Sequence, residues 1–160
     1  MRIFLILSIF LFACYSFKGT SIDPDIKYFS IDPVEDQSSS APSSYPVDFG
    51  LALGNKIRRE SRLVLNNSKP DLKFVCRITQ FNITSVAPIA GQTNAINRLT
   101  VNIDVEGINL LNEKNNWKKS FSRFEDFDAN KSFSEVETIV LNNINKQLLE
   151  DIFNGAFSNW

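Results

Sequence analysis

The 160-residue sequence contains no histidine, and this absence excludes several kinds of catalytic site. A Ser-His-Asp triad, a histidine-ligated metal ion and the usual general base near neutral pH all need an imidazole group. The acidic residues offer no clear substitute, because Glu135 and Glu137 are spaced as in the first turn of a helix, where the helix dipole favours them. Glu125, Asp126 and Asp128 belong to the polar stretch before that helix. We therefore expect no enzyme, no metal site and no cofactor.

A strong excess of basic residues is also lacking. The chain has 17 Lys and Arg residues against 18 Asp and Glu residues, which gives a formal net charge of -1. Non-specific binding to nucleic acid needs a marked basic excess to neutralise phosphates. Nucleic acid is therefore not an expected partner.

The N-terminus has an apolar run that is too short to span a bilayer. Residues 3–13 are apolar apart from Ser8, which is about the length of the central region of a signal peptide. The run closes on Leu11-Phe12-Ala13-Cys14, which resembles the lipobox of bacterial lipoproteins, where the cysteine is acylated and becomes the first residue. We predict a signal peptide over 1–13, a covalent lipid on Cys14 and a tether over 14–25. An ordinary secretory signal that is cut near Cys14 is the alternative.

Acylation of Cys14 would leave Cys76 as the one remaining thiol. A single cysteine can form neither an intramolecular disulfide nor a cysteine zinc site. We expect Cys76 to be a small buried apolar residue.

The remaining chain, residues 26–160, has the length of one domain, and the fourteen phenylalanines of the sequence supply bulky core material. The clearest strand signals are Leu72 to Thr79 and Leu99 to Glu106, where apolar and polar residues alternate. If the two pair antiparallel with Phe74 opposite Val105, Lys73 lies opposite Glu106. A third strand is expected over 117–127, with a bulge near Ser122 that reconciles Phe121 with Phe124.

Two helices are predicted. The first covers residues 47–61 with an apolar stripe of Phe49, Leu53 and Ile57, and glycines at 50 and 54 let it lie close to a sheet. The second covers residues 132–157, where Ser132 and Glu135 form a capping box. Its apolar stripe is formed by Val136, Val140, Ile144, Leu148, Ile152 and Ala156.

A short strand is expected over 26–31, an edge strand over 63–65 and a loop with little core over 35–46, which contains five serines and two prolines. Because every long strand has one apolar and one polar face, both helices should cover the same side of the sheet. We predict an α+β fold, a two-layer sandwich in which two helices cover one face of a mainly antiparallel sheet of about four strands. The other face of the sheet is left polar and is available to a partner.

Several stretches, taken together and in order, resemble one family, the LptE lipoproteins of lipopolysaccharide assembly in their Bacteroidetes-type form. The stretches are Cys14-Tyr15-Ser16-Phe17, Asn97-Arg98-Leu99-Thr100-Val101, Ser120-Phe121-Ser122-Arg123-Phe124-Glu125-Asp126-Phe127, Ser134-Glu135-Val136-Glu137 and the C-terminal residues 151–160. The resemblance implies an α/β sandwich that sits as a plug inside the LptD β-barrel of the outer membrane. It also implies that the protein assists assembly of this barrel and interacts with lipopolysaccharide during its insertion into the outer leaflet.

Binding of lipopolysaccharide requires Lys and Arg side chains that meet lipid phosphates. Our candidates are Arg98 and Arg123, with Lys118 and Lys119 behind them. A solvated charge or a local salt bridge is the alternative role for each of the four.

The expected location is the periplasmic side of the outer membrane, held by the lipid. A generic periplasmic lipoprotein adaptor that recruits another envelope complex is the competing interpretation, because it would use the same polar face. A surface-exposed lipoprotein is a third, but residues 15–20 lack the acidic run that resembles a surface-export signal.

The lipobox interpretation predicts that Cys14→Ala leaves an unacylated precursor, since no thiol remains at the modification site. Metabolic labelling with palmitate measures this directly, and the unmutated chain is the positive control. A Cys14→Ala variant that still takes up labelled palmitate would contradict the interpretation.

Overall fold

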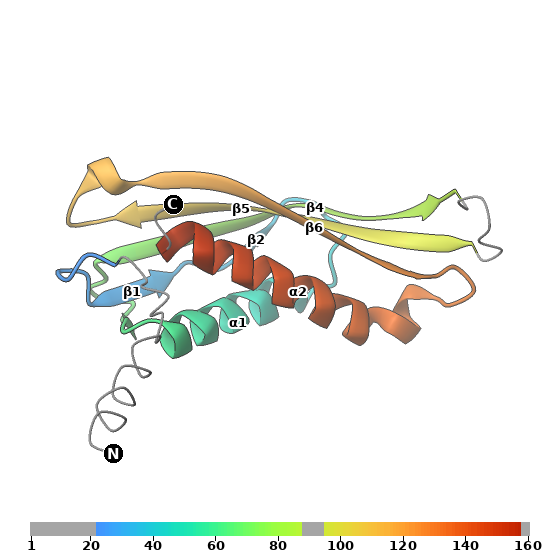
Figure 1. Cartoon of the computed structure of the whole chain (residues 1–160), viewed down its shortest axis with the longest axis horizontal. Coiled ribbons are helices and arrows are strands. Elements are labelled where there is room, and N and C mark those ends of the chain that lie inside the picture. Colours follow the sequence, from blue (N-terminus) through green and yellow to red (C-terminus); the bar gives the residue numbers. More distant parts are fainter. Residues whose placement is uncertain (1–21, 88–94, 158–160) are drawn as a thin grey trace, which may run out of the picture.

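The computed structural model describes residues 22–87 and 95–157 (Figure 1). The elements in chain order are β1 (Tyr28–Ile31), β2 (Glu35–Asp36), α1 (Tyr45–Glu60), β3 (Val64–Leu65), β4 (Leu72–Val86), β5 (Ile96–Asn109), the 3-10 helix η2 (Glu113–Asn115), β6 (Trp117–Asp128) and α2 (Phe133–Phe157). The predicted signal peptide, Cys14 and most of the tether lie outside the described residues, as do the last three residues of the chain.

The strands form one sheet in the order β3-β1-β4-β5-β6, and β2 pairs with β4. The three long strands β4, β5 and β6 are antiparallel neighbours, whereas β1, β2 and β3 make parallel pairs. Helices α1 and α2 lie on one face of this sheet, and no helix within 22–87 and 95–157 covers the other face (Figure 1). The predicted two-layer α+β sandwich is confirmed. The described sheet has six strands because β2 and β3, each two residues long, add to the four longer ones.

The core lies between the sheet and the two helices. Alternate residues of β5 from Leu99 onward and of β4 from Leu72 to Ile78 are buried, in keeping with their alternating pattern. The predicted helix stripes point into the same core, and their members Phe49, Leu53, Ile57, Val140, Ile144, Leu148 and Ile152 are at most 3% exposed. Each such side chain contributes about 1.5–3 kcal/mol through removal of apolar surface from water. No helix in the described ranges is both long enough and apolar enough to cross a membrane.

Two glycines let α1 approach the sheet closely, as the sequence predicts. A Cβ atom on Gly50 would lie 3.2 Å from Cγ2 of Val34, and one on Gly54 would lie 3.5 Å from Cδ1 of Ile31. The helix therefore packs against β1 and the segment that follows it.

The predicted pairing of the two central strands has the right direction but the wrong register. Phe74 lies opposite Gly107, and Val105 lies opposite Cys76, so the strands are displaced by two residues from the predicted alignment. A displacement of two keeps every apolar residue on its own face, and the alternating pattern therefore cannot distinguish the two registers. The predicted pair of Lys73 and Glu106 does not form. Lys73 instead forms a salt bridge with Asp32, with Nζ 2.8 Å from Oδ2.

The bulge predicted near Ser122 is also wrong. The pairing of β5 with β6 is continuous along the whole of β6, and the irregularity lies in β4, between Ile78 and Gln80. Phe124 has the opposite parity to Phe121 because its ring lies on the face that no helix covers, where it is 51% exposed. A surface role for one aromatic residue, rather than a bulge, explains the broken alternation.

The segment 35–46 is more ordered than the predicted loop. Glu35 and Asp36 pair with β4 as strand β2, and α1 begins at Tyr45, before the predicted start of the helix. Tyr45 is 2% exposed, and its hydroxyl group donates a 2.7 Å hydrogen bond to Oδ1 of Asn145 in α2. Burial raises the pKa of the Tyr45 hydroxyl well above its ordinary value. The expectation of little core in this segment is therefore wrong at Tyr45, which joins the two helices.

The start of α2 has one half of the predicted capping box, because the N–H of Glu135 donates to the carbonyl of Ser132 and not to its hydroxyl oxygen. The carboxylate of Glu135 accepts a 2.7 Å hydrogen bond from the backbone N–H of Ser132 and a 2.6 Å bond from its hydroxyl group. These bonds lower the pKa of Glu135. The carboxylate thus satisfies a backbone donor that precedes the helix.

One contact in the sheet predicts a sharp difference between two glycine substitutions. Gly107 of β5 lies opposite Trp117 of β6, and a Cβ atom at residue 107 would lie 2.3 Å from two indole atoms. Gly107→Ala should therefore lower the free energy of unfolding by about 1–3 kcal/mol, because the indole ring has to move. Gly54→Ala is the control, since its Cβ atom would make only an ordinary van der Waals contact with Ile31 and should raise stability by up to about 1 kcal/mol. Urea titration of both variants measures the difference, and equal effects would contradict the packing described.

Candidate functional site

The face of the sheet that no helix of the described residues covers, called here the open face, is a broad polar surface. It consists of the side chains of β4, β5 and β6 that point away from both helices. Its members on β5 and β6 are Arg98, Thr100, Asn102, Asp104, Glu106, Lys118, Ser120, Ser122, Phe124 and Asp126. Those on β4 include Lys73, Val75, Arg77, Gln80, Asn82 and Thr84.

Arg98 is the centre of a well-defined cluster on this face. It lies opposite Asp126, and the two side chains form a bidentate salt bridge with N–O distances of 2.7 and 2.9 Å. The guanidinium carbon also lies 3.9 Å from the centre of the Phe124 ring, which is the geometry of a cation–π contact. The hydrogen bonds to Arg98 lower the pKa of Asp126, and those from Asp126 raise the pKa of Arg98.

Other charges on the open face also have partners. Lys73 pairs with Asp32, and Arg77 lies 3.6 Å from a carboxylate oxygen of Glu35 and 3.7 Å from one of Glu106. Asp104 accepts a hydrogen bond from the hydroxyl group of Ser120. Local compensation of this kind leaves little net field for the attraction of a strongly charged partner.

The middle of the open face is neutral and polar. The amide group of Asn102 donates a 2.6 Å hydrogen bond to Oε1 of Gln80, which lies opposite it on β4. Oδ1 of Asn102 is buried and has no hydrogen-bond partner among the described residues. Thr100 and Ser122 flank the pair with hydroxyl groups.

The helix side of β6 carries a second polar cluster. The guanidinium of Arg123 forms a bidentate salt bridge with Asp151 of α2, with N–O distances of 2.5 and 2.8 Å. Asn143 donates a 2.8 Å hydrogen bond to Oε1 of Glu125, and Nζ of Lys119 donates one of 2.8 Å to the carbonyl of Gly155. A shallow groove of about 650 Å³ runs between β6 and α2 along these residues. The bonds hold the edge of the sheet against α2.

The four basic residues predicted to bind lipopolysaccharide do not come together in one site. Arg98 and Lys118 lie on the open face, whereas Arg123 and Lys119 lie on the helix side of β6. Lys118 lies opposite Glu106, far along the strand from Arg98, which lies opposite Asp126. Local salt bridges, the alternative weighed for each residue, are present at Arg98 and Arg123.

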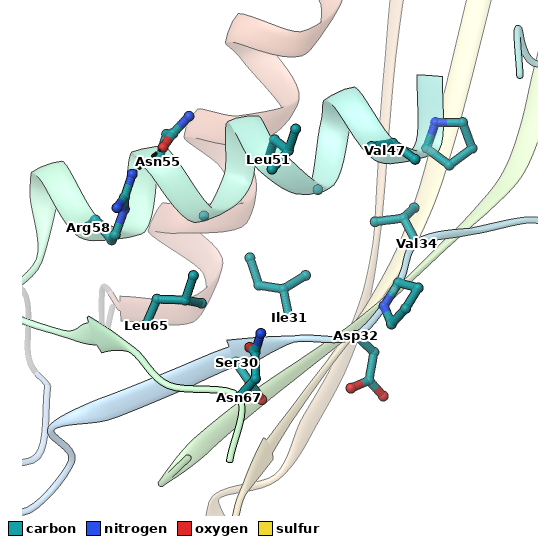
Figure 2. Close-up of a pocket in the computed structure, with 14 residues that line it drawn as sticks. Ser30, Ile31, Asp32, Val34, Val47, Leu51, Asn55, Arg58, Leu65 and Asn67 are labelled. Carbon is teal, nitrogen blue, oxygen red and sulfur yellow. Dashed lines mark hydrogen bonds between the residues drawn. The ribbon is translucent and has the colours of Figure 1, made fainter. Parts of the chain in front are cut away.

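A mainly apolar groove of about 770 Å³ lies on the other side of the molecule, between α1 and the edge formed by β1 and β3. Ile31 and Val34 point toward α1, which contributes Val47 and Leu51, and Leu65 closes the far end (Figure 2). Val47 and Leu51 remain more than 60% exposed. Sequence analysis missed this groove because it depends on how β3 and α1 meet across β1.

Buried reactive groups elsewhere have structural explanations. Cys76 is fully buried, as predicted, and burial raises the pKa of its thiol to about 12, so it is a poor nucleophile. Lys56 is also buried, and its ammonium group contacts carboxylates of Glu60 and Glu150 at 2.8 and 2.6 Å. Burial alone would lower the pKa of Lys56, but hydrogen bonds to Glu150 and Glu60 outweigh it and raise the pKa. Within 22–87 and 95–157, no group of three or more His, Cys, Asp or Glu residues could hold a metal ion.

Comparison with protein-family models and with curated proteins gives no match to this sequence. Solved structures, in contrast, share its fold. A DUF330 protein from Xanthomonas campestris superposes with a TM-score of 0.55 at 7% identity, over 87% of this chain and 90% of that chain. A minor lipoprotein from Acinetobacter baumannii gives 0.51 at 11% identity, over 82% and 96%. An uncharacterized lipoprotein B from Nitrosomonas europaea gives 0.50 at 11% identity, over 87% of each chain.

These identities are low enough that the likeness concerns the fold alone. The chain therefore has an α+β sandwich fold that is also found in bacterial lipoproteins. The superpositions extend over most of each chain, so the shared unit is the whole sandwich rather than one hairpin or helix pair.

Proposed function

We propose that the protein is a lipid-anchored lipoprotein of the bacterial outer membrane, held on its periplasmic side by a lipid on Cys14. Two independent observations support this. The sequence Leu11-Phe12-Ala13-Cys14 resembles a lipobox, and the fold is one that bacterial lipoproteins also have. Several acyl chains on one cysteine would hold the domain firmly at the membrane surface.

The open face is the surface that we assign to a protein partner. It is broad and polar, no helix of the described residues covers it, and its charges are largely compensated in place. The wet, polar interior of a large outer-membrane barrel is a surface of matching chemistry. With the resemblance to LptE lipoproteins, this supports an LptD-like barrel as the partner, which the protein would plug and help to assemble. No catalytic group is needed for such a role.

In this proposal the protein also takes part in lipopolysaccharide insertion into the outer leaflet. Arg98 is the best-placed of the four basic candidates, because its guanidinium is already oriented by Asp126 and Phe124 on the open face. Phosphate groups would compete with the Asp126 carboxylate for the same planar donors. A generic periplasmic adaptor that binds another envelope complex would use the same face, and the two roles differ in the identity of the partner.

The barrel proposal predicts that the full-length lipidated protein, captured from native outer membranes, brings an LptD-like barrel with it in stoichiometric amount. Ser122→Arg, on the open face, should abolish recovery of the barrel because it places a bulky charge in a neutral interface. Asn142→Arg, on the exposed surface of α2, is the matched control and should retain it. Mass spectrometry of the captured proteins is the measurement.

Recovery of a different envelope complex, lost with Ser122→Arg, would favour the adaptor role. Capture that is equal for both variants would contradict the assignment of the open face.

The lipid-binding proposal predicts that simultaneous charge reversal at Arg98 and Arg123 weakens binding of lipopolysaccharide to the purified full-length protein while the fold stays intact. The control carries Asp126→Lys and Asp151→Lys, which break the same two salt bridges but keep both arginines. Binding should fall in the first variant and persist in the second. Unchanged binding in the arginine variant, with an unchanged circular-dichroism melting curve, would contradict these two residues as lipid contacts.

A further inference from the structure

One end of the molecule exposes apolar side chains together with basic ones. This end, called here the proximal end, is formed by residues 22–28, 62–71 and 109–116, and it lies at the left of Figure 1. Half of the large hydrophobic side chains that are exposed in the described residues lie here. They are Tyr28, Val64, Leu65, Leu110 and Leu111, with exposed fractions from 40% to 57%.

Hydrogen bonds fix the three segments of the proximal end to one another. The carboxylate of Asp71 accepts hydrogen bonds of 2.9 Å from the backbone N–H groups of Lys27 and Tyr28, and these bonds lower its pKa. The carbonyl of Asp71 accepts a 2.8 Å bond from the N–H of Leu110. Asn109, which is 4% exposed, accepts bonds from the N–H groups of Leu111 and Asn112. The leucines are thus presented by an ordered turn.

The N-terminal segment enters the fold at this same end. The guanidinium of Arg62 donates three hydrogen bonds to backbone carbonyls of this segment. The bond to Asp23 is 2.6 Å long, and those to Ile22 and Pro24 are each 3.4 Å long. Cys14 precedes Ile22 by eight residues, and a fully extended chain of that length spans at most about 28 Å. A lipid on Cys14 would therefore hold the proximal end near the bilayer. Strand β4 alone is about 50 Å long, so the opposite end lies much farther away in an upright molecule.

Charge is distributed unevenly between the two ends. Lys27, Lys69 and Lys114 are exposed at the proximal end, whose three segments together hold four basic residues (Lys27, Arg62, Lys69 and Lys114) and four acidic ones (Asp23, Asp25, Asp71 and Glu113). At the opposite end, residues 125–137 contain several acidic side chains and one basic side chain, Lys131. The chain as a whole has a net charge of -1. The opposite end is thus acidic, and the N-terminal segment leaves from the end whose lysines and carboxylates balance.

From these observations we infer that the proximal end is a membrane-contact surface that rests on lipid headgroups, with Leu110, Leu111 and Val64 inserted into the interface. The inference rests on the lipid anchor of the proposed function. Exposed leucine and aromatic side chains combined with lysines are the composition that binds the boundary between headgroups and acyl chains. Lysines near the surface are attracted by anionic lipids within about one Debye length. This contact would orient the long strands away from the membrane surface and leave the open face free for a partner.

Nitroxide labelling of the full-length lipidated protein tests this surface. Leu111→Cys is labelled and reconstituted in vesicles of phosphatidylethanolamine and phosphatidylglycerol, and collisions with oxygen and with a nickel chelate are compared by spin resonance. Cys76 stays unlabelled because it is buried and its thiol has a pKa of about 12. Ile139→Cys, 67% exposed on α2, is the matched control. We expect the ratio of oxygen to nickel collisions to be several-fold higher at residue 111, and Val64→Cys to behave like Leu111→Cys.

The charged part of the surface has its own control. Lys69→Glu combined with Lys114→Glu should lower the collision ratio at residue 111, whereas Lys131→Glu at the opposite end should not change it. A ratio at residues 111 and 64 equal to that at residue 139 would overturn the inference. Flotation of the same samples reports on the anchor separately. If the protein floats with the vesicles but its labels at residues 111 and 64 are exposed to water, the contact surface alone is overturned. If the protein does not float with the vesicles, the lipid anchor is overturned as well.

Discussion

The whole structure depends on one constraint, the burial of a single face of β4 and β5. Both strands alternate apolar and polar residues, so one side of the central sheet has to be removed from water. Two helices with apolar stripes satisfy that requirement, and Tyr45, hydrogen-bonded to Asn145, fixes them relative to each other. The other side remains polar for the same reason. The open face is therefore a direct consequence of the pattern that builds the core.

Sequence patterns predicted the parts of the fold that depend on periodicity. The stripes of α1 and α2, the apolar faces of the long strands and the placement of both helices on one side all follow from spacings of 3.6 and 2 residues. The register of β4 against β5 could not be obtained in this way, because a shift of two residues preserves every face. The bulge in β4 and the burial of Tyr45 in a serine-rich segment depend on contacts with distant residues.

The candidate site was harder to predict than the fold. Arg98 and Asp126 are 28 residues apart in the sequence and become neighbours only in the correct register of β5 and β6. Arg98 and Arg123 appear equivalent in sequence, yet their parities place them on opposite faces of the sheet. One signal was present in the sequence. Phe124 is an odd number of residues from Phe121, so the two rings lie on opposite faces of the strand. This spacing indicates that Phe124 lies on the polar face, where it contacts Arg98.

The parallel pairing of the first strands has a consequence for the order in which the domain can fold. Strands β1 and β2 pair with β4, and β3 is joined to the sheet through β1 alone. Before β4 is available, the segment up to β3 has only a two-residue pairing of β1 with β3 and no apolar sheet face for α1 to cover. In contrast, β4, β5, β6 and α2 follow one another and pack on their sequence neighbours. The N-terminal part of the domain, although made first, therefore has no sheet to join until β4 is available.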